Sequence, residues 1–119
     1  MKVCIPSMGE GGLTDQVGQH FGRVPTYTIL DTETKEVSVI PNTSEHLGGV
    51  GLPPELLSKA GIDVMLCSGL GGRAVQLFEG FGISVFVNAQ GTVQDAISAW
   101  EAGELPEATM ATACQEHQH

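Results

Sequence analysis

An apolar run at 62–67 passes directly into a glycine-rich turn, Ser68-Gly69-Leu70-Gly71-Gly72-Arg73, and this transition most constrains the fold. A short apolar run that ends in such a turn is typical of a strand buried on both faces in a parallel sheet. A glycine turn between a strand and a helix exposes backbone N–H groups at the helix N-terminus, where anions bind. The transition therefore predicts an α/β fold with an anion site at the carboxyl end of this strand.

The rest of the chain extends this unit into one α/β domain. Alternating or apolar segments predict five strands, at 2–6, 25–31, 37–40, 62–67 and 83–87. Helix signals predict three helices: one after Pro53 and Pro54, one at 72–80, and one that Thr92 caps. A shorter helical turn is expected at 14–20, and the polar turn after 25–31 predicts an antiparallel hairpin that ends at Pro41. The order β-β-β-α-β-α-β-α predicts a mixed five-stranded sheet flanked by helices, with 2–6 and 62–67 as the central pair.

Length and charge limit the class of protein. The 119 residues suffice for one domain, which we place at 1–105, followed by a flexible polar tail at 106–119. A formal net charge of −9 repels phosphate backbones and argues against nucleic-acid binding. No segment is long and apolar enough for a membrane span, and the first residues do not resemble a secretory signal. We therefore expect a cytoplasmic monomer with no membrane contact.

The glycine turn itself allows more than one interpretation. Gly69-x-Gly71-x-x-Ala74 matches a loosened dinucleotide fingerprint, but the next strand ends in Asn88-Ala89-Gln90 without the acidic residue that would hold a ribose. Close packing of a helix on the sheet also explains small residues here. An anion site without a dinucleotide is the remaining interpretation.

Two arginines favour the anion site. The chain has only five lysines and arginines, and both arginines, Arg23 and Arg73, flank glycine segments. A guanidinium group offers a fork of donors and is weakly hydrated, which suits it to anions. Surface ion pairs with some of the fourteen carboxylates are the alternative.

Candidate metal ligands occur near the same glycines. His20 and His46 precede glycines, and Cys67 ends the apolar run. Neutral imidazole and thiolate groups bind metals, although histidines are often simply hydrogen-bonded and buried cysteines are often inert. The odd number of cysteines, three, argues against a disulfide framework.

A separate set of donors lies in the tail. Cys114, His117 and His119 follow a Cys-x-x-His-x-His spacing, which is enough for a weak, flexible zinc, copper or nickel site. A solvated tail without a preformed site is the alternative.

At these residues the chain resembles the dinitrogenase iron–molybdenum cofactor biosynthesis family, which includes nitrogenase accessory cofactor carriers and the orange protein of sulfate reducers. The resemblance covers about 1–105 and depends on the order of several short motifs. These are His20-Phe21-Gly22-Arg23, Asn42 with His46 and Gly48-Gly49, and the segment from Cys67 to Ala74.

The resemblance implies a ribonuclease-H-like motif fold and a carrier rather than an enzyme. It implies a molybdenum–copper sulfide cluster or an iron–molybdenum–sulfur cluster as the bound group, with cluster donor or acceptor proteins as partners. Such a cluster is anionic, and the family resemblance allows binding either through protein ligands or without covalent protein ligands. Nothing in the family pattern extends to the tail.

We therefore predict a site over the carboxyl ends of the strands at 2–6 and 62–67. The predicted cluster-binding residues are Met8, Gly9, Gly11, Gly12, His20, Phe21, Gly22, Arg23, His46, Gly48, Gly49, Val50, Cys67, Ser68, Gly69, Leu70, Gly71, Gly72 and Arg73. The predicted metal ligands are His20, His46, Cys67, Cys114, His117 and His119. The alternative function is an anion- or nucleotide-responsive regulatory module at the same turn. A ribonuclease-H-type enzyme ranks last, because the central strands lack clustered carboxylates.

Overall fold

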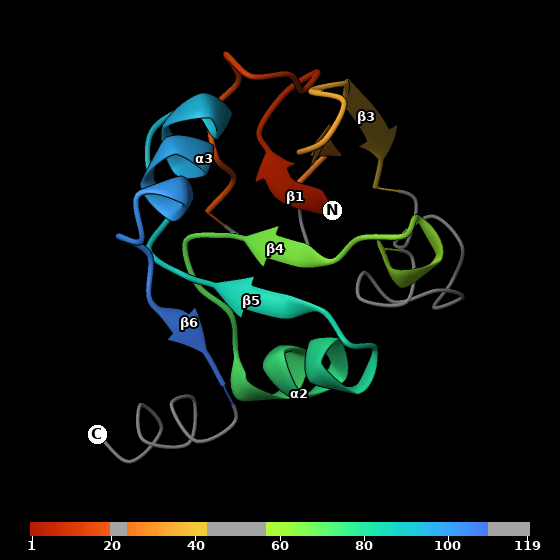
Figure 1. The fold of residues 1–119 in the computed structure, drawn as a ribbon, viewed down its shortest axis with the longest axis vertical. Coiled ribbons are helices and arrows are strands. Elements are labelled where there is room, and N and C mark those ends of the chain that lie inside the picture. Colours follow the sequence, from red (N-terminus) through yellow and green to blue (C-terminus); the bar gives the residue numbers. More distant parts are fainter. Residues whose placement is uncertain (20–23, 43–56, 110–119) are drawn as a thin grey trace.

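A computed structural model describes residues 1–19, 24–42 and 57–109 of the chain. The sheet has the order β3-β2-β1-β4-β5-β6, in which β4 is parallel to β1 and to β5 and the other pairs are antiparallel (Figure 1). The elements are β1 Lys2–Ser7, β2 Thr26–Asp31, β3 Val37–Pro41, β4 Val64–Leu66, α2 Gly72–Gly80, β5 Ser84–Phe86, α3 Val93–Glu101 and β6 Glu107–Ala108. The predicted α/β class, the hairpin and the central pair β1 and β4 are confirmed.

The central strands are buried on both faces, as their apolar runs predict. Along β1, Cys4 faces one core cluster, whereas Val3 and Ile5 face the other. Phe78 of α2 belongs to the first cluster and Ile97 of α3 to the second, so the two helices cover opposite faces of the sheet. Loops that leave the carboxyl ends of β1, β4 and β5 consequently meet at one edge of this layered core.

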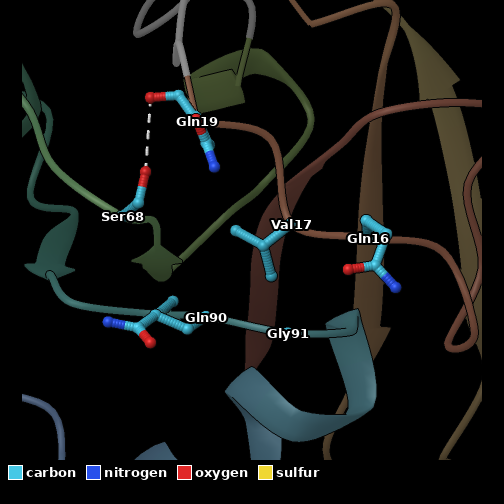
Figure 2. A pocket seen from close by; sticks show the side chains of 7 residues that line it. Gln16, Val17, Gln19, Ser68, Gln90 and Gly91 are labelled. Atoms are coloured by element: carbon cyan, nitrogen blue, oxygen red, sulfur yellow. Dashed lines mark hydrogen bonds between the residues drawn. The ribbon is translucent and has the colours of Figure 1, made fainter.

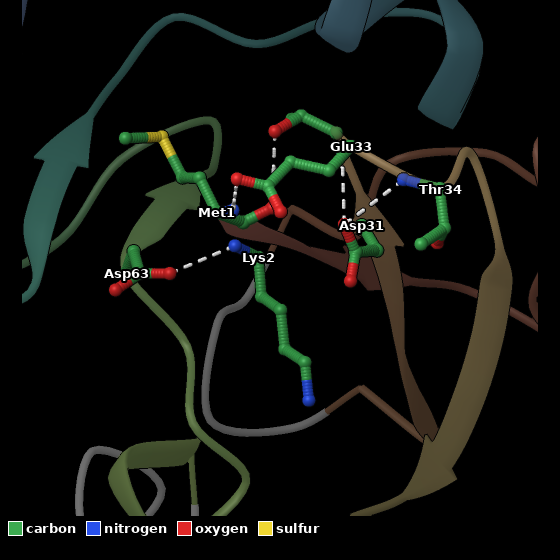
Figure 3. Close-up of polar contacts among 7 residues, drawn as sticks. Met1, Lys2, Asp31, Glu33, Thr34 and Asp63 are labelled. Atoms are coloured by element: carbon green, nitrogen blue, oxygen red, sulfur yellow. Dashed lines mark hydrogen bonds and ion pairs between the residues drawn. The ribbon is translucent and has the colours of Figure 1, made fainter.

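Backbone and side-chain hydrogen bonds at the opposite edge fix the register of β1 against β4. The Lys2 N–H donates to the Asp63 carboxylate at 2.8 Å, and the Asp63 N–H donates to the Lys2 carbonyl at 2.9 Å (Figure 3). This reciprocal pair holds the start of β4 beside the start of β1. The side-chain pattern of β4 is thereby set, because a slip of one residue would exchange its two faces.

Pro41 belongs to β3, although the sequence predicts that the strand ends at this proline. Glu36 and Asn42 direct their backbone groups toward β2, through the Asp31 N–H to Glu36 carbonyl bond and the Asn42 N–H to Pro25 carbonyl bond, each 2.9 Å. Since antiparallel pairing alternates, residues of odd number direct their backbone groups outward. The missing N–H of Pro41 therefore lies on the outer side of an edge strand, where proline is tolerated.

The sheet has six strands rather than the predicted five. Glu107 and Ala108 form β6 and pair antiparallel with Phe86 and Val85 of β5. The expectation of a flexible tail from 106 onward is therefore wrong at these residues. A two-residue strand has too short a pattern to be detected, and its pairing depends on the exposed edge of β5.

The segment after the first glycine loop is extended, not helical as predicted. Val17 bridges to Ser7 and Gln16 bridges to Thr92. The Asp15 and Leu13 carbonyls accept the first N–H groups of α3, from Val93 at 2.8 Å and Gln94 at 2.9 Å. The segment at 13–15 thus lies beside a helix almost eighty residues away in the sequence.

The Asp15 side chain shapes the glycine loop. Its carboxylate accepts N–H bonds from Gly9 at 2.9 Å, Gly11 at 2.8 Å and Gln16 at 2.8 Å. Slight desolvation acts to raise the pKa of Asp15, but these three hydrogen bonds outweigh it, so the pKa lies below its ordinary value.

Two further aspartates stabilise turns in the same way. The Glu33 and Thr34 N–H groups donate to Asp31 in the β2–β3 turn and lower its pKa (Figure 3). The Thr92 N–H and hydroxyl interact with Asp95 in a capping box at the start of α3 and lower the pKa of Asp95.

Replacing Asp15 by alanine should lower the free energy of unfolding by about 1–3 kcal/mol, because three N–H groups lose a charged acceptor. Urea denaturation followed by circular dichroism measures the change. Glu10→Ala is the matched control, since Glu10 is an exposed carboxylate in the same loop and accepts none of these hydrogen bonds. Equal stability of the two variants would contradict this role.

Acid should destabilise the fold in a defined pH range. A carboxyl group with a lowered native pKa contributes stability that is fully present above its unfolded pKa of about 4 and is lost as pH falls through the native pKa. The free energy of unfolding should therefore be nearly constant between about pH 5 and 7 and fall below about pH 4. A triple variant with asparagine at Asp15, Asp31 and Asp95 should show a weaker fall in urea titrations at each pH, and an unchanged slope would refute the assignment.

Candidate functional site

A pocket of about 560 Å³ lies where loops follow the carboxyl ends of β1, β4 and β5 (Figure 2). Its described lining consists of Gln16, Val17, Gln19, Ser68, Ala89, Gln90 and Gly91. Ligands of open α/β sheets bind at this edge, where the strand order reverses. Here the reversal falls at β1, from which the chain continues to β2 on one side and β4 lies on the other.

The lining suits an anion better than a cation. Its polar side chains are three amides and one hydroxyl, and the described lining includes no carboxylate. That composition contrasts with the chain as a whole, in which fourteen acidic residues outnumber five basic ones. The side-chain amides can donate hydrogen bonds to an anion without the repulsion that a carboxylate would add.

In the described part of the chain two helices begin at this edge of the sheet, and of these two α3 has a capped N-terminus. Thr92 and Asp95 form its capping box, and carbonyls of the 13–15 segment accept its first two N–H groups. The N-cap of α2 is Gly71, which makes no side-chain capping bond, and the first turn of α2 contains no acidic residue. The first N–H groups of α2 are therefore the ones available to an anion.

The glycines before α2 leave room for a ligand. At Gly69 and Gly71 an added Cβ would meet no described atom within 4 Å, and neither backbone requires a positive φ. By contrast, Gly11 has a φ of 92°, and its Cβ would lie 2.6 Å from Cγ1 of Val39. Packing and backbone conformation explain Gly11 but do not explain the two glycines of the α2 turn.

Arg73 adds positive charge at the same helix end. It lies in the first turn of α2, is exposed, and forms no ion pair with a described residue. The alternative role in a surface ion pair is therefore not seen in the described part of the chain. A guanidinium next to helical N–H groups, neither of which has a partner among the described residues, is a suitable environment for a negative charge.

The structure argues against Cys67 as a metal ligand. Its side chain is 1% exposed, lies in the core cluster with Cys4, and contacts the Phe86 carbonyl at 3.8 Å. Burial raises the pKa of Cys67 to about 12, despite a bond from the Gly69 N–H that acts in the opposite direction. Burial thus disfavours the free thiolate, and the alternative of a structural core cysteine fits this environment. Cys4 is buried in the same core cluster.

The first glycine loop does not join the pocket, contrary to the predicted enclosure. Gly9 and Gly11 are held by Asp15, and the Gly12 N–H donates to the Thr28 hydroxyl of β2 at 3.0 Å. The loop consequently packs toward β2 and β3, in the half of the sheet away from β5 (Figure 1). Met8 is 55% exposed and likewise does not line the pocket.

Several predicted residues lie outside the described part of the chain. They are His20, Phe21, Gly22, Arg23, His46, Gly48, Gly49, Val50, Cys114, His117 and His119. Within the ranges 1–19, 24–42 and 57–109, no three histidine, cysteine or acidic side chains come together as a metal site. Of the predicted residues, Ser68 lines the pocket, and the glycines and Arg73 of the turn lie along the same edge.

Sequence analysis missed the glutamines of the pocket. Gln16 and Gln19 occur in the segment that the sequence predicts to be helical. Gln90 occurs where a dinucleotide site would need an acidic residue to bind the ribose. Neutral amides have no characteristic motif. The position of Gln90 just after β5, at the carboxyl edge, was the available signal.

Comparison with known proteins decides the family. Residues 1–103 match the family model for the dinitrogenase iron-molybdenum cofactor. The chain belongs to this family. The resemblance inferred from the sequence is thereby confirmed, and family membership associates the chain with this cofactor.

Solved structures share the fold. The apo form of the orange protein from Desulfovibrio gigas is 24% identical, with a TM-score of 0.76 over 90% of this chain and 92% of that chain. The crystal structure of PH0822 is 31% identical, with a TM-score of 0.76 over 91% and 96%. The Thermotoga protein TM1290, solved by NMR, is 30% identical, with a TM-score of 0.72 over 89% and 91%. Among the described residues of this chain, no helix is long and apolar enough to cross a membrane.

Substitutions at two glycines should separate conformational from ligand roles. Gly69→Ala should change the free energy of unfolding by no more than about 0.5 kcal/mol, because its Cβ points into open space. Gly11→Ala should cost about 1–3 kcal/mol through its positive φ and the contact with Val39. Urea denaturation compares them, and an equal loss in both would show that Gly69 is also a structural glycine.

Proposed function

We propose that the chain binds and carries an anionic, molybdenum-containing metal–sulfur cluster as a storage, assembly or transfer protein. The cluster is of the molybdenum–copper sulfide type or the iron–molybdenum–sulfur type. One observation carries the proposal: the turn from Ser68 to Gly72 joins a pocket with no described carboxylate to the uncapped N-terminus of α2. Membership of the dinitrogenase iron-molybdenum cofactor family supports the choice of anion.

The described groups suit cluster sulfides as hydrogen-bond acceptors. N–H groups in the first turn of α2 and the Arg73 guanidinium supply donors and positive charge, and the side-chain amides of the pocket supply further donors. The open space over Gly69 and Gly71 lets a bulky anion approach the backbone. A cluster held by such bonds exchanges without breaking metal–protein bonds, which suits a carrier that delivers its cargo to an acceptor protein.

Roles for the remaining predicted residues belong to the same proposal. Arg23 would add a second guanidinium, and His20 and His46 would provide imidazole donors or ligands. The tail residues Cys114, His117 and His119 are proposed as a separate, weak metal site. All these residues lie outside the described ranges.

Replacing Arg73 by alanine should weaken binding of a thiomolybdate anion about ten-fold or more, the effect of losing one charge-assisted hydrogen bond. Anaerobic titration with tetrathiomolybdate, with and without Cu(I), measures affinity from the change in the visible spectrum. Lys59→Ala is the charge-matched control, because Lys59 is an exposed cation that precedes β4, at the other end of the strand. Equal affinity of wild type and Arg73→Ala would remove Arg73 from the site.

The competing function is an anion- or nucleotide-responsive regulatory module. The same uncapped helix end would hold a phosphate group, so this alternative rests on the same observation. Thermal denaturation with nucleotides distinguishes the two. A ligand at about one hundred times its Kd stabilises a fold by about 2.7 kcal/mol. Stabilisation by nucleotides with no response to tetrathiomolybdate would replace the carrier proposal.

A further inference from the structure

Three loops of the pocket meet at Ser68. Its carbonyl accepts the Asn88 N–H at 3.1 Å, which ties the loop after β5 to the loop after β4. Its hydroxyl contacts the Gln19 carbonyl at 3.3 Å and the Gly18 carbonyl at 3.5 Å, in the segment that follows β1 (Figure 2). Backbone and side chain of one residue therefore connect all three walls of the pocket.

The segment after β1 is anchored less firmly as it approaches Gln19. The Val17 N–H donates to the Gly91 carbonyl and the Gly18 N–H to the Pro6 carbonyl, each at 2.9 Å. Beyond Gly18, the contact found for the Gln19 backbone within the described ranges is the hydroxyl of Ser68. The next four residues along the chain are His20-Phe21-Gly22-Arg23, the first motif of the family resemblance.

Packing does not demand a serine at this position. Ser68 is half-buried and lines the pocket, so an alanine would fit without a steric cost. Its hydroxyl has a single proton, which it donates to a carbonyl of the segment after β1. The hydroxyl is thus the group that distinguishes serine from alanine here.

We propose that Ser68 is a positioning residue of the pocket. Its hydroxyl holds the segment at 16–19 against the turn that leads to α2, and so it preorganises the described walls of the pocket. The effect on anion affinity rests on the proposed function. The effect on the loop does not, because it follows from hydrogen bonds within the protein alone.

The test compares Ser68→Ala with Ser68→Thr, which keeps the hydroxyl, and with Ser84→Ala as a matched control. Ser84 is an exposed serine that begins β5, at the opposite edge of the sheet. Hydrogen–deuterium exchange of the ligand-free protein follows the amides of 16–19. In Ser68→Ala these amides should exchange about five-fold faster, the equivalent of one net hydrogen bond. Ser68→Thr and Ser84→Ala should exchange like the wild type.

Tetrathiomolybdate titration of the same variants completes the test. Ser68→Ala should bind about five-fold more weakly than the wild type, with global stability measured in urea to show that the domain remains folded. Unchanged exchange at 16–19 in Ser68→Ala would overturn the proposal. Faster exchange in a protein whose wild type does not bind the anion would confirm the loop connection and refute the proposed cargo instead.

Discussion

The candidate site lies at the edge of the sheet where β1, β4 and β5 end. Its arrangement depends on the segment at 13–17, which covers the N-terminus of α3 and not that of α2. Carbonyls of Leu13 and Asp15 accept the first N–H groups of α3, and Thr92 and Asp95 complete its cap. All these partners lie on one side of the sheet, and α2 on the other side begins at a glycine without a side-chain cap. Of these two helix ends, which would otherwise attract anions equally, the end of α3 is covered, whereas the end of α2 keeps first-turn N–H groups that have no partner among the described residues.

The difference between the N-termini of α2 and α3 depends on the positions of the central strands. β1 and β4 are buried on both faces, and the reciprocal hydrogen bonds of Lys2 and Asp63 fix their register. The loops after β1, β4 and β5 then emerge side by side, and Ser68 connects them. In a chain with a net charge of −9, a lining of amides and a hydroxyl keeps local repulsion of an anion low.

Local patterns predicted most of the framework. The helix at 72–80, the Thr92 cap and the antiparallel hairpin are confirmed, because glycine turns, capping residues and apolar periodicity act over a few residues. Pairing across the fold could not be predicted in this way. β6 forms because the edge of β5 accepts it, and Asp15 lies beside α3 because the sheet brings them together.

The site was predicted in part. The turn from Ser68 to Arg73 lies at the expected edge, but the first glycine loop packs on β2 and β3. Alternation along a strand shows that Cys67 shares a face with Met65, yet it cannot show that this face is the core beneath α2. The glutamines of the pocket were not predicted, because a side-chain amide indicates a binding site only once the fold places it at the end of a strand.

The most direct test of the central claim is an anaerobic NMR titration of uniformly 15N-labelled protein with tetrathiomolybdate. The account predicts shifts of the backbone amides from Ser68 to Ala74 and of the side-chain amides of Gln16, Gln19 and Gln90. Amides at the capped start of α3, from Val93 to Asp95, should stay unchanged. Shifts confined to α3 or to the first glycine loop, or no shifts at saturating anion, would contradict it.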